Sequence, residues 1–125
     1  MQEELWTLFP EDRQGFWRDT ILAAEQIQEI RLRANRPVLI RRVEGDCYLD
    51  ETGRFTDKPK EAHRTGEEEI EELLSHICHD SPYAYEDELR QGYITVPGGH
   101  RVGLSGQAVL ENGKIRTLKH IYYMN

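Results

Sequence analysis

The dipeptide Asn112-Gly113 lies between two long runs of strand-forming residues, at positions 102–110 and 115–123. Asn and Gly readily take the positive φ angles of a tight reversal between antiparallel strands, so this pattern predicts a β-hairpin. A third run, at positions 93–96, is followed by Pro97-Gly98-Gly99-His100, which has the residues of another chain reversal. The sequence therefore predicts a closing three-stranded antiparallel meander.

The first half of the chain predicts one helical layer and then short strands. Positions 11–24 carry large apolar residues, Phe16 and Trp17 among them, at the spacing of a helix that buries one side. Two strand candidates at positions 27–32 and 38–40 flank the turn-forming residues 34–37, and positions 47–49 add a short third strand. The polar segment 50–66 is expected to be a loop.

Two helices are predicted between these strands and the meander. Thr65 can cap the first helix, and the glutamates at positions 67–69 suit the positive end of its dipole. Its buried stripe should consist of the apolar residues at helical spacing, which are Ile70, Leu73, Leu74 and Ile77. Ser81-Pro82 begins the second helix, and Gly92 ends it. The predicted fold class is α+β, in a single domain.

Composition limits the classes of function. The net charge of −7 disfavours a broad nucleic-acid or anionic-membrane surface. No apolar run approaches the ~20 residues that a bilayer span needs. Cys47 and Cys78 are the only two cysteines and lie in unrelated contexts, which favours free thiols in a reducing cytoplasm over a disulfide.

Histidines occur in two places that could carry chemistry. His76 and His79 are three residues apart on a helix and could face one metal ion, with Cys78 and Asp80 beside them. Cys78 would point to another side of that helix and no second ligand pair stands out, so we expect a polar helix end and no metal. His100 has no serine or cysteine nucleophile identifiably paired with it, and we expect a turn or interface residue.

Two long motifs resemble a known family. They are QEIRLRANRPVLI at positions 28–40 and SPYAYEDELRQGYITVPGGHRVGLSGQAVLENGKIRTLKHI at positions 81–121, with EEIEELLSHI between them. Together they resemble the amino-terminal domain of the stage III sporulation protein AA family, which is similar to the ATPases of type II and type IV secretion systems. The resemblance covers positions 26–125, and positions 1–25 form a helical lead-in.

The resemblance implies a two-part motor. Its amino-terminal part would be a PAS-like domain, with flanking helices on a mixed or antiparallel sheet, and a RecA-like domain carrying the phosphate loop would follow. No GxxxxGK[ST] motif occurs in this chain, so we expect the RecA-like domain to lie beyond residue 125 and this part not to hydrolyse ATP. ATP and Mg²⁺ are implied for the longer protein, and no cofactor or metal for this part.

The resemblance also implies a site and partners. In such ATPases the amino-terminal domain sits over the nucleotide in a hexameric ring and supplies arginines to the phosphates, a task that suits the planar, permanently charged guanidinium. The arginine candidates, in order, are Arg101, Arg31, Arg33 and Arg90, with Gly98, Gly99, His100 and Gly103 as turn or interface residues. The implied partners are the RecA-like domain, neighbouring subunits and membrane channel proteins of the sporulation complex, in the mother-cell cytoplasm beside the membrane around the forespore.

Plainer interpretations stay open for these residues. Arg31 and Arg33 also fit the wet face of any half-buried strand, and Arg90 can form a surface ion pair with Glu86 or Asp87. An alternative function is a free-standing adaptor that binds a protein through the glycine-rich hairpin. A single-stranded nucleic-acid binder is a third, which the net charge opposes; it would use Tyr93, His100, Arg101, Lys114, Arg116 and Lys119.

Overall fold

A computed structural model describes residues 8–23, 26–96, 100–111 and 114–124, with the backbone alone from Ser105 onward. Its main sheet has seven strands in the order β5-β4-β3-β1-β9-β8-β7, and every described pairing between neighbours is antiparallel. The strands are β1 (Ile27–Arg33), β3 (Leu39–Arg42), β4 (Cys47–Leu49), β5 (Phe55–Thr56), β7 (Tyr93–Val96), β8 (His100–Glu111) and β9 (Lys114–Met124). A separate two-stranded sheet joins β2 (Arg36–Pro37) to β6 (Arg64–Thr65).

The predicted closing meander is confirmed. β7 pairs with β8 and β8 pairs with β9, with Val96 opposite His100 and Glu111 opposite Lys114. The predicted turn residues Pro97, Gly98, Gly99, Asn112 and Gly113 lie outside the described residues. The strands on either side of both turns therefore have the register that tight reversals would give.

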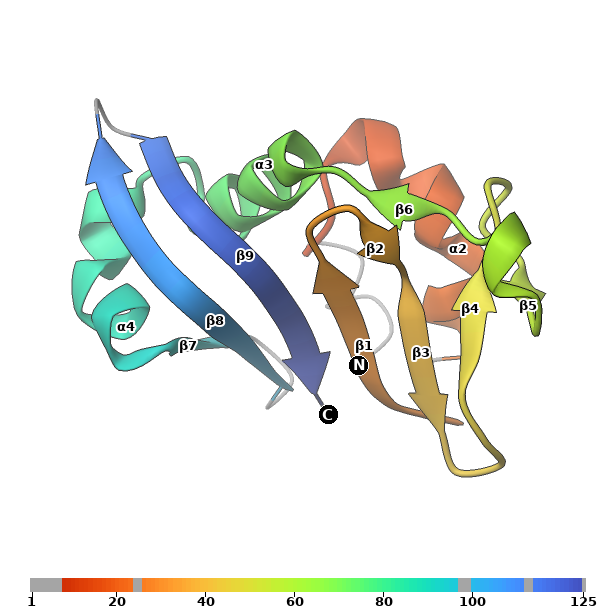
Figure 1. The fold of residues 1–125 in the computed structure, drawn as a ribbon. Coiled ribbons are helices and arrows are strands. Elements are labelled where there is room, and N and C mark those ends of the chain that lie inside the picture. The colour runs from red at the N-terminus through yellow and green to blue at the C-terminus, as the bar shows by residue number, and fades with distance from the viewer. Residues whose placement is uncertain (1–7, 24–25, 97–99, 112–113, 125) are drawn as a thin grey trace.

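Strand β1 joins the two halves of the sheet. On one edge Ile30 pairs with Ile40 of β3, and on the other edge it pairs with Tyr123 of β9. An early hairpin and the late meander thus become one sheet through a single strand (Figure 1).

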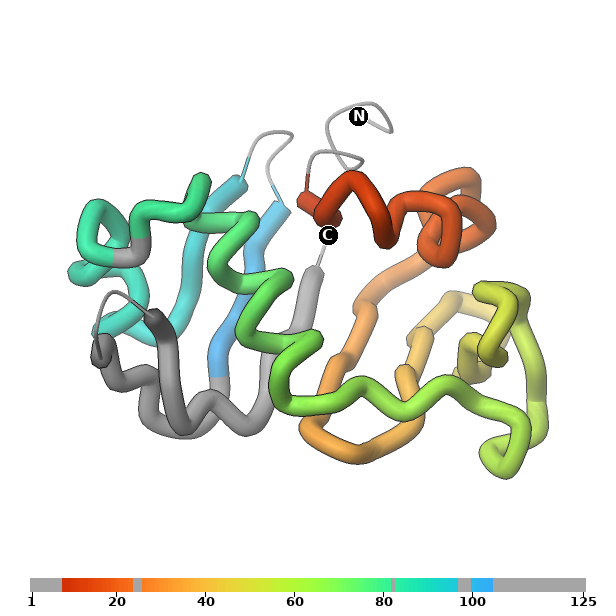
Figure 2. The backbone as a smooth tube through the Cα atoms, turned by 90° about the horizontal axis from the view of Figure 1, so that it is seen from above, coloured from red at the N-terminus to blue at the C-terminus, as the bar shows by residue number. Residues whose placement is uncertain are grey.

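The α-helices lie behind the strands in the view of Figure 1. They are α2 (Gln14–Leu22), α3 (Glu67–Ile77) and α4 (Glu86–Gln91), accompanied by the 3₁₀ helices η1 (Glu11–Arg13), η3 (Pro59–Glu61) and η4 (Pro82–Tyr85). Seen from above in Figure 2, α3 runs between α2 and α4. The α+β class is confirmed, whereas the PAS-like topology stays a prediction.

The core forms where α3 meets the sheet. The buried residues of α3 are the four predicted ones, Ile70, Leu73, Leu74 and Ile77. They share one apolar cluster with Ile30 of β1, Ile94 of β7 and Val102 of β8, each of which is at most 2% exposed. Burying such a side chain contributes roughly 1.5–3 kcal/mol, so α3 and the sheet stabilise each other mainly through this contact.

The prediction that Thr65 caps α3 is wrong. Thr65 belongs to β6, where it pairs with Arg36, and its carbonyl accepts a hydrogen bond from the Asn35 amide at 2.7 Å. The helix begins after Gly66 instead, which is extended and makes no side-chain cap. Thr65 is completely buried where β6 pairs with β2, and its hydroxyl has no partner among the described residues, so strand pairing prevailed over capping.

Two other predictions need refinement. The segment 50–66 is not only a loop, because β5, η3 and β6 lie within it. Ser81 precedes a 3₁₀ turn, η4, and makes no side-chain cap, while the α-helix α4 starts at Glu86. Gly92 ends α4 with a φ of 92°, as predicted from the preference of glycine for that conformation.

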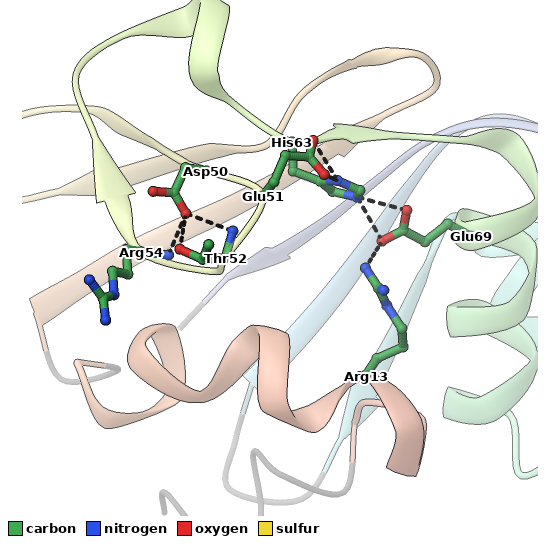
Figure 3. A network of polar contacts seen from close by, with 7 residues as sticks. All are labelled: Arg13, Asp50, Glu51, Thr52, Arg54, His63 and Glu69. Carbon is green, nitrogen blue, oxygen red and sulfur yellow. Dashed lines mark hydrogen bonds and ion pairs between the residues drawn. The ribbon is translucent and has the colours of Figure 1, made fainter.

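A polar network fastens α2 to the rest of the fold (Figure 3). His63 lies between two carboxylates, with Nδ1 3.2 Å from Glu51 and Nε2 2.9 Å from Glu69. Arg13, at the start of α2, donates a hydrogen bond to the same Glu69 at 2.9 Å, and the Phe16 ring meets the His63 ring edge-on at 4.9 Å. Arg13 and His63 therefore meet at Glu69, and His63 links this group to Glu51.

Candidate functional site

The face of the sheet turned towards the viewer in Figure 1 carries none of the described α-helices. Along β1 the side chains alternate: Ile30 and Leu32 are buried among the helices, while Arg31 and Arg33 are partly exposed on the other face. Residues paired across strands share a face, which adds several positions from β3, β7 and β8. We call this surface the open face and define it by Glu29, Arg31, Arg33, Arg41, Tyr93 and Arg101.

A carboxylate holds two of these arginines. Glu29 is only 8% exposed, and its Oε1 accepts a hydrogen bond from Nε of Arg31 at 2.8 Å. Its Oε2 lies 3.8 Å from Nη1 of Arg41, whose Nε is 3.7 Å from Asp46. Arg31 uses Nε for Glu29. Its two terminal nitrogens have no hydrogen-bond partner among the described residues, so they remain as a pair of donors on a partly exposed side chain.

Arg101 is held differently. Its guanidinium lies over the ring of Tyr93 on the neighbouring strand, 4.6 Å from the ring centre. The side chain is exposed, and within the described part of the chain no carboxylate pairs with it. A cation over an aromatic face is oriented without being neutralised. Arg101 therefore keeps its full charge available for an anionic partner.

The third predicted arginine of the open face, Arg33, follows Arg31 on β1. Its Nε is buried and has no hydrogen-bond partner within the part of the chain that the structure describes. From the pairing register, the Cα atoms of Arg31 and Arg101 are separated by the strand β9 and by two residues along the strands, which is about 12 Å at ordinary strand spacings. Guanidinium groups on side chains as long as arginine can approach a common anion across that separation.

Arg90 does not join this group. It lies on α4 and forms ion pairs with Glu86 at 3.1 Å and Asp87 at 3.6 Å, with 69% of its side chain exposed. The spacing of Arg90 from Glu86 and Asp87 along the helix predicts this surface ion pair. His100 and Gly103 both lie in β8. Gly103 pairs with Tyr93 and lies on the open face, whereas His100 pairs with the buried Val96 and lies on the opposite face of the sheet. Gly98 and Gly99 lie outside the described residues.

Two members of the open face were missing from the sequence analysis. Arg41 and Glu29 are neighbours through the β1–β3 register, and the ion pair between them depends on a pairing that residue spacing alone does not give. The only sequence signal for these two residues is the alternation of charged and apolar residues on both strands. It marks which residues face away from the core, but not which of them touch.

The cysteines and histidines show no sign of a reactive centre. Both cysteines are buried free thiols, as predicted, and burial raises the pKa of Cys78 to about 11, with a further contribution from Glu88. Burial likewise raises the pKa of Cys47. Among the described residues no group of three or more His, Cys, Asp or Glu side chains is placed to hold a metal ion.

Among the residues that the structure describes, no helix combines the length and the apolar character needed to cross a bilayer.

Comparisons with known proteins agree with the motifs. A family model described as "Sporulation stage III, protein AA" matches residues 1–125. Stage III sporulation protein AA of Bacillus subtilis (strain 168) is 39% identical over 100 residues, which is 80% of this chain and 29% of that relative. No solved structure matches the chain. This chain belongs to the stage III sporulation protein AA family.

Proposed function

We propose that this chain is the amino-terminal, non-hydrolytic domain of a secretion-type ATPase used in endospore formation, and that its open face contacts nucleotide phosphates. The observation that carries the proposal is that Arg31, Arg33 and Arg101, from two strands that are not neighbours, share one helix-free face of the sheet. Membership of the sporulation family supports this role. The lack of a GxxxxGK[ST] motif in this chain supports the assignment of ATP hydrolysis to another domain.

The geometry suits a phosphate ligand. Arg31 presents two terminal nitrogens side by side, the arrangement that binds two oxygens of one phosphate. Arg101 brings an unneutralised charge that can stabilise the negative charge developing during phosphoryl transfer. ATP and Mg²⁺ would be bound by a RecA-like domain, and this domain would add only its arginines.

The partners follow from that role. They are the RecA-like domain of the same protein and the neighbouring subunits of a hexameric ring, with channel proteins in the membrane around the forespore. The protein would work in the mother-cell cytoplasm. The role of the domain is to assist ring assembly and to sense whether phosphate is present.

The test is ATP turnover by the full-length gene product. Arg101→Ala and Arg31→Ala should each lower turnover at least about tenfold, because an arginine that touches the transferring phosphate contributes that much or more. Arg90→Ala is the matched control, since it removes an exposed arginine that pairs only within α4. The proposal fails if a folded Arg101→Ala protein keeps full turnover, or if Arg90→Ala is impaired equally.

A second candidate is an adaptor that binds an acidic protein segment without any dependence on nucleotide. It is supported by Glu29, a carboxylate of the chain itself that lies between Arg31 and Arg41 on the open face. Under this alternative, substitutions on the open face would abolish binding of a protein partner and leave turnover unchanged.

A further inference from the structure

Charge is unevenly distributed between the sheet and the helices. The helices η1, α2, α3 and α4 contain eleven acidic and three basic residues. In contrast, Glu29 is the one carboxylate on the strands β1, β3, β4, β7 and the described side chains of β8, which together carry five arginines. In a molecule with a net charge of −7, the described strands thus carry mainly basic residues and the described helices mainly acidic ones.

The acidic surface is concentrated on α3. Glu68 and Glu72 are exposed, lie one helical turn apart, and have no ion-pair partner among the described residues. Like charges at this spacing destabilise a helix by a few tenths of a kcal/mol. Glu69 differs from them because it forms an ion pair with Arg13 and also contacts Nε2 of His63.

We infer that the open face of one molecule binds the acidic outer side of α3 of a second copy. Among the described residues, Arg101 and the terminal nitrogens of Arg31 lack carboxylate partners, and Glu68 and Glu72 lack basic partners. Contact between these surfaces would give the two arginines and the two glutamates partners of opposite charge. Hydrogen bonds between guanidinium and carboxylate groups are stronger than hydrogen bonds between neutral groups. Tyr93, which is 37% exposed, supplies apolar contact area beside Arg101.

The dimensions allow this contact. Seven strands span roughly 30 Å across the sheet, whereas a helix of eleven residues such as α3 is about 16 Å long. A stable interface buries about 800 Å² on each partner, which is near one tenth of the 7582 Å² of accessible surface. The open face is therefore wide enough to receive α3.

A single contact of this type cannot form a two-fold symmetric dimer. The open face and the outer side of α3 are different surfaces of the molecule, so every contact leaves one surface of each kind free. Such a head-to-tail interface builds a ring or an open chain. This inference concerns the domain alone and does not rest on nucleotide binding, although carboxylate and phosphate would compete for the same guanidinium groups.

Sedimentation velocity of the 125-residue chain without nucleotide tests the inference. At ~0.01 M salt, where the Debye length is about 30 Å, species larger than dimers should grow with protein concentration, and at ~1 M salt they should dissociate. Arg31→Gln with Arg101→Gln, and separately Glu68→Gln with Glu72→Gln, should each weaken association about tenfold or more. Arg90→Gln is the matched control and should associate as the unmodified chain does.

Mixing gives the decisive result. Each double variant keeps one intact surface, so an equimolar mixture should form a 1:1 dimer that grows no further at any concentration. Unfolding midpoints equal to that of the unmodified chain would establish that both variants are folded. The inference is overturned if the unmodified chain stays monomeric at low salt, if either folded variant assembles normally by itself, or if the mixture does not dimerise.

Discussion

Replacing Gly53 by alanine should loosen α2 from the sheet. Gly53 has a φ of +84°, and a Cβ built there would lie 2.9 Å from the carbonyl carbon of Phe16 and closer still to its oxygen. Those atoms belong to the backbone of α2, so no side-chain rotation can relieve the clash. Gly45 is the matched control, because its φ is +131° but nothing lies within 4 Å of a Cβ there.

The magnitude follows from two separate costs. Placing alanine at a positive φ costs roughly 1–2 kcal/mol, and both substitutions incur that cost. Overpacking against a fixed backbone adds about 1–3 kcal/mol for Gly53→Ala alone. Gly53→Ala should therefore lose about 2–5 kcal/mol in total, a large share of the 5–15 kcal/mol that is typical of the free energy of unfolding.

Urea denaturation measures the difference between the variants. With a slope of about 1–3 kcal/mol per molar urea, the midpoint of Gly53→Ala should lie on the order of 1 M below that of Gly45→Ala. Amide hydrogen exchange should also quicken in α2 for Gly53→Ala and stay unchanged there for Gly45→Ala. Equal midpoints and equal exchange rates in the two variants would refute the close packing of Gly53 on α2.

Three further substitutions test other parts of the structure. Thr65→Val should raise the free energy of unfolding by about 1 kcal/mol, since it removes a buried hydroxyl without a partner, whereas loss of a helix cap would lower it by about as much. The folded-state pKa of Cys78, about 11, lies above the ordinary cysteine value of 9.0. The protonated thiol therefore adds to the free energy of unfolding in full below pH 9, and this contribution is lost as the pH rises to 11. Unfolding midpoints should fall across that window, and more steeply than in Cys78→Ala. His63→Ala removes the contacts with Glu51 and Glu69 and should cost about 1–3 kcal/mol while quickening exchange in α2; unchanged exchange would contradict its role in fastening that helix.

Local sequence signals located the secondary structure well. The stripe Ile70, Leu73, Leu74 and Ile77 is buried as predicted, because the spacing of a helix fixes which side chains share a side. Gly92 ends α4 for an equally local reason. The error at Thr65 arose where a distant pairing with β2 competed with the local capping preference.

The candidate site was less accessible to sequence reasoning. That Arg31 and Arg33 share a face follows from period-two alternation, but their relation to Arg101 depends on β9 inserting between β1 and β8. Strand order across a sheet is a long-range property that spacing does not encode. The same reason explains why Glu29 and Arg41 were missed.

The position of β1 has a consequence for the newly made chain. β3 can pair with β1 soon after both are synthesised, but β9, its partner on the other edge, is made at the far end of the sequence. Until then one edge of β1 stays open, and open edges invite pairing with other unfinished chains. Arg31 and Arg33 interrupt the apolar run of that edge with charge, which discourages aggregation. We therefore expect an unfinished chain in which both arginines are replaced by apolar residues to aggregate more readily.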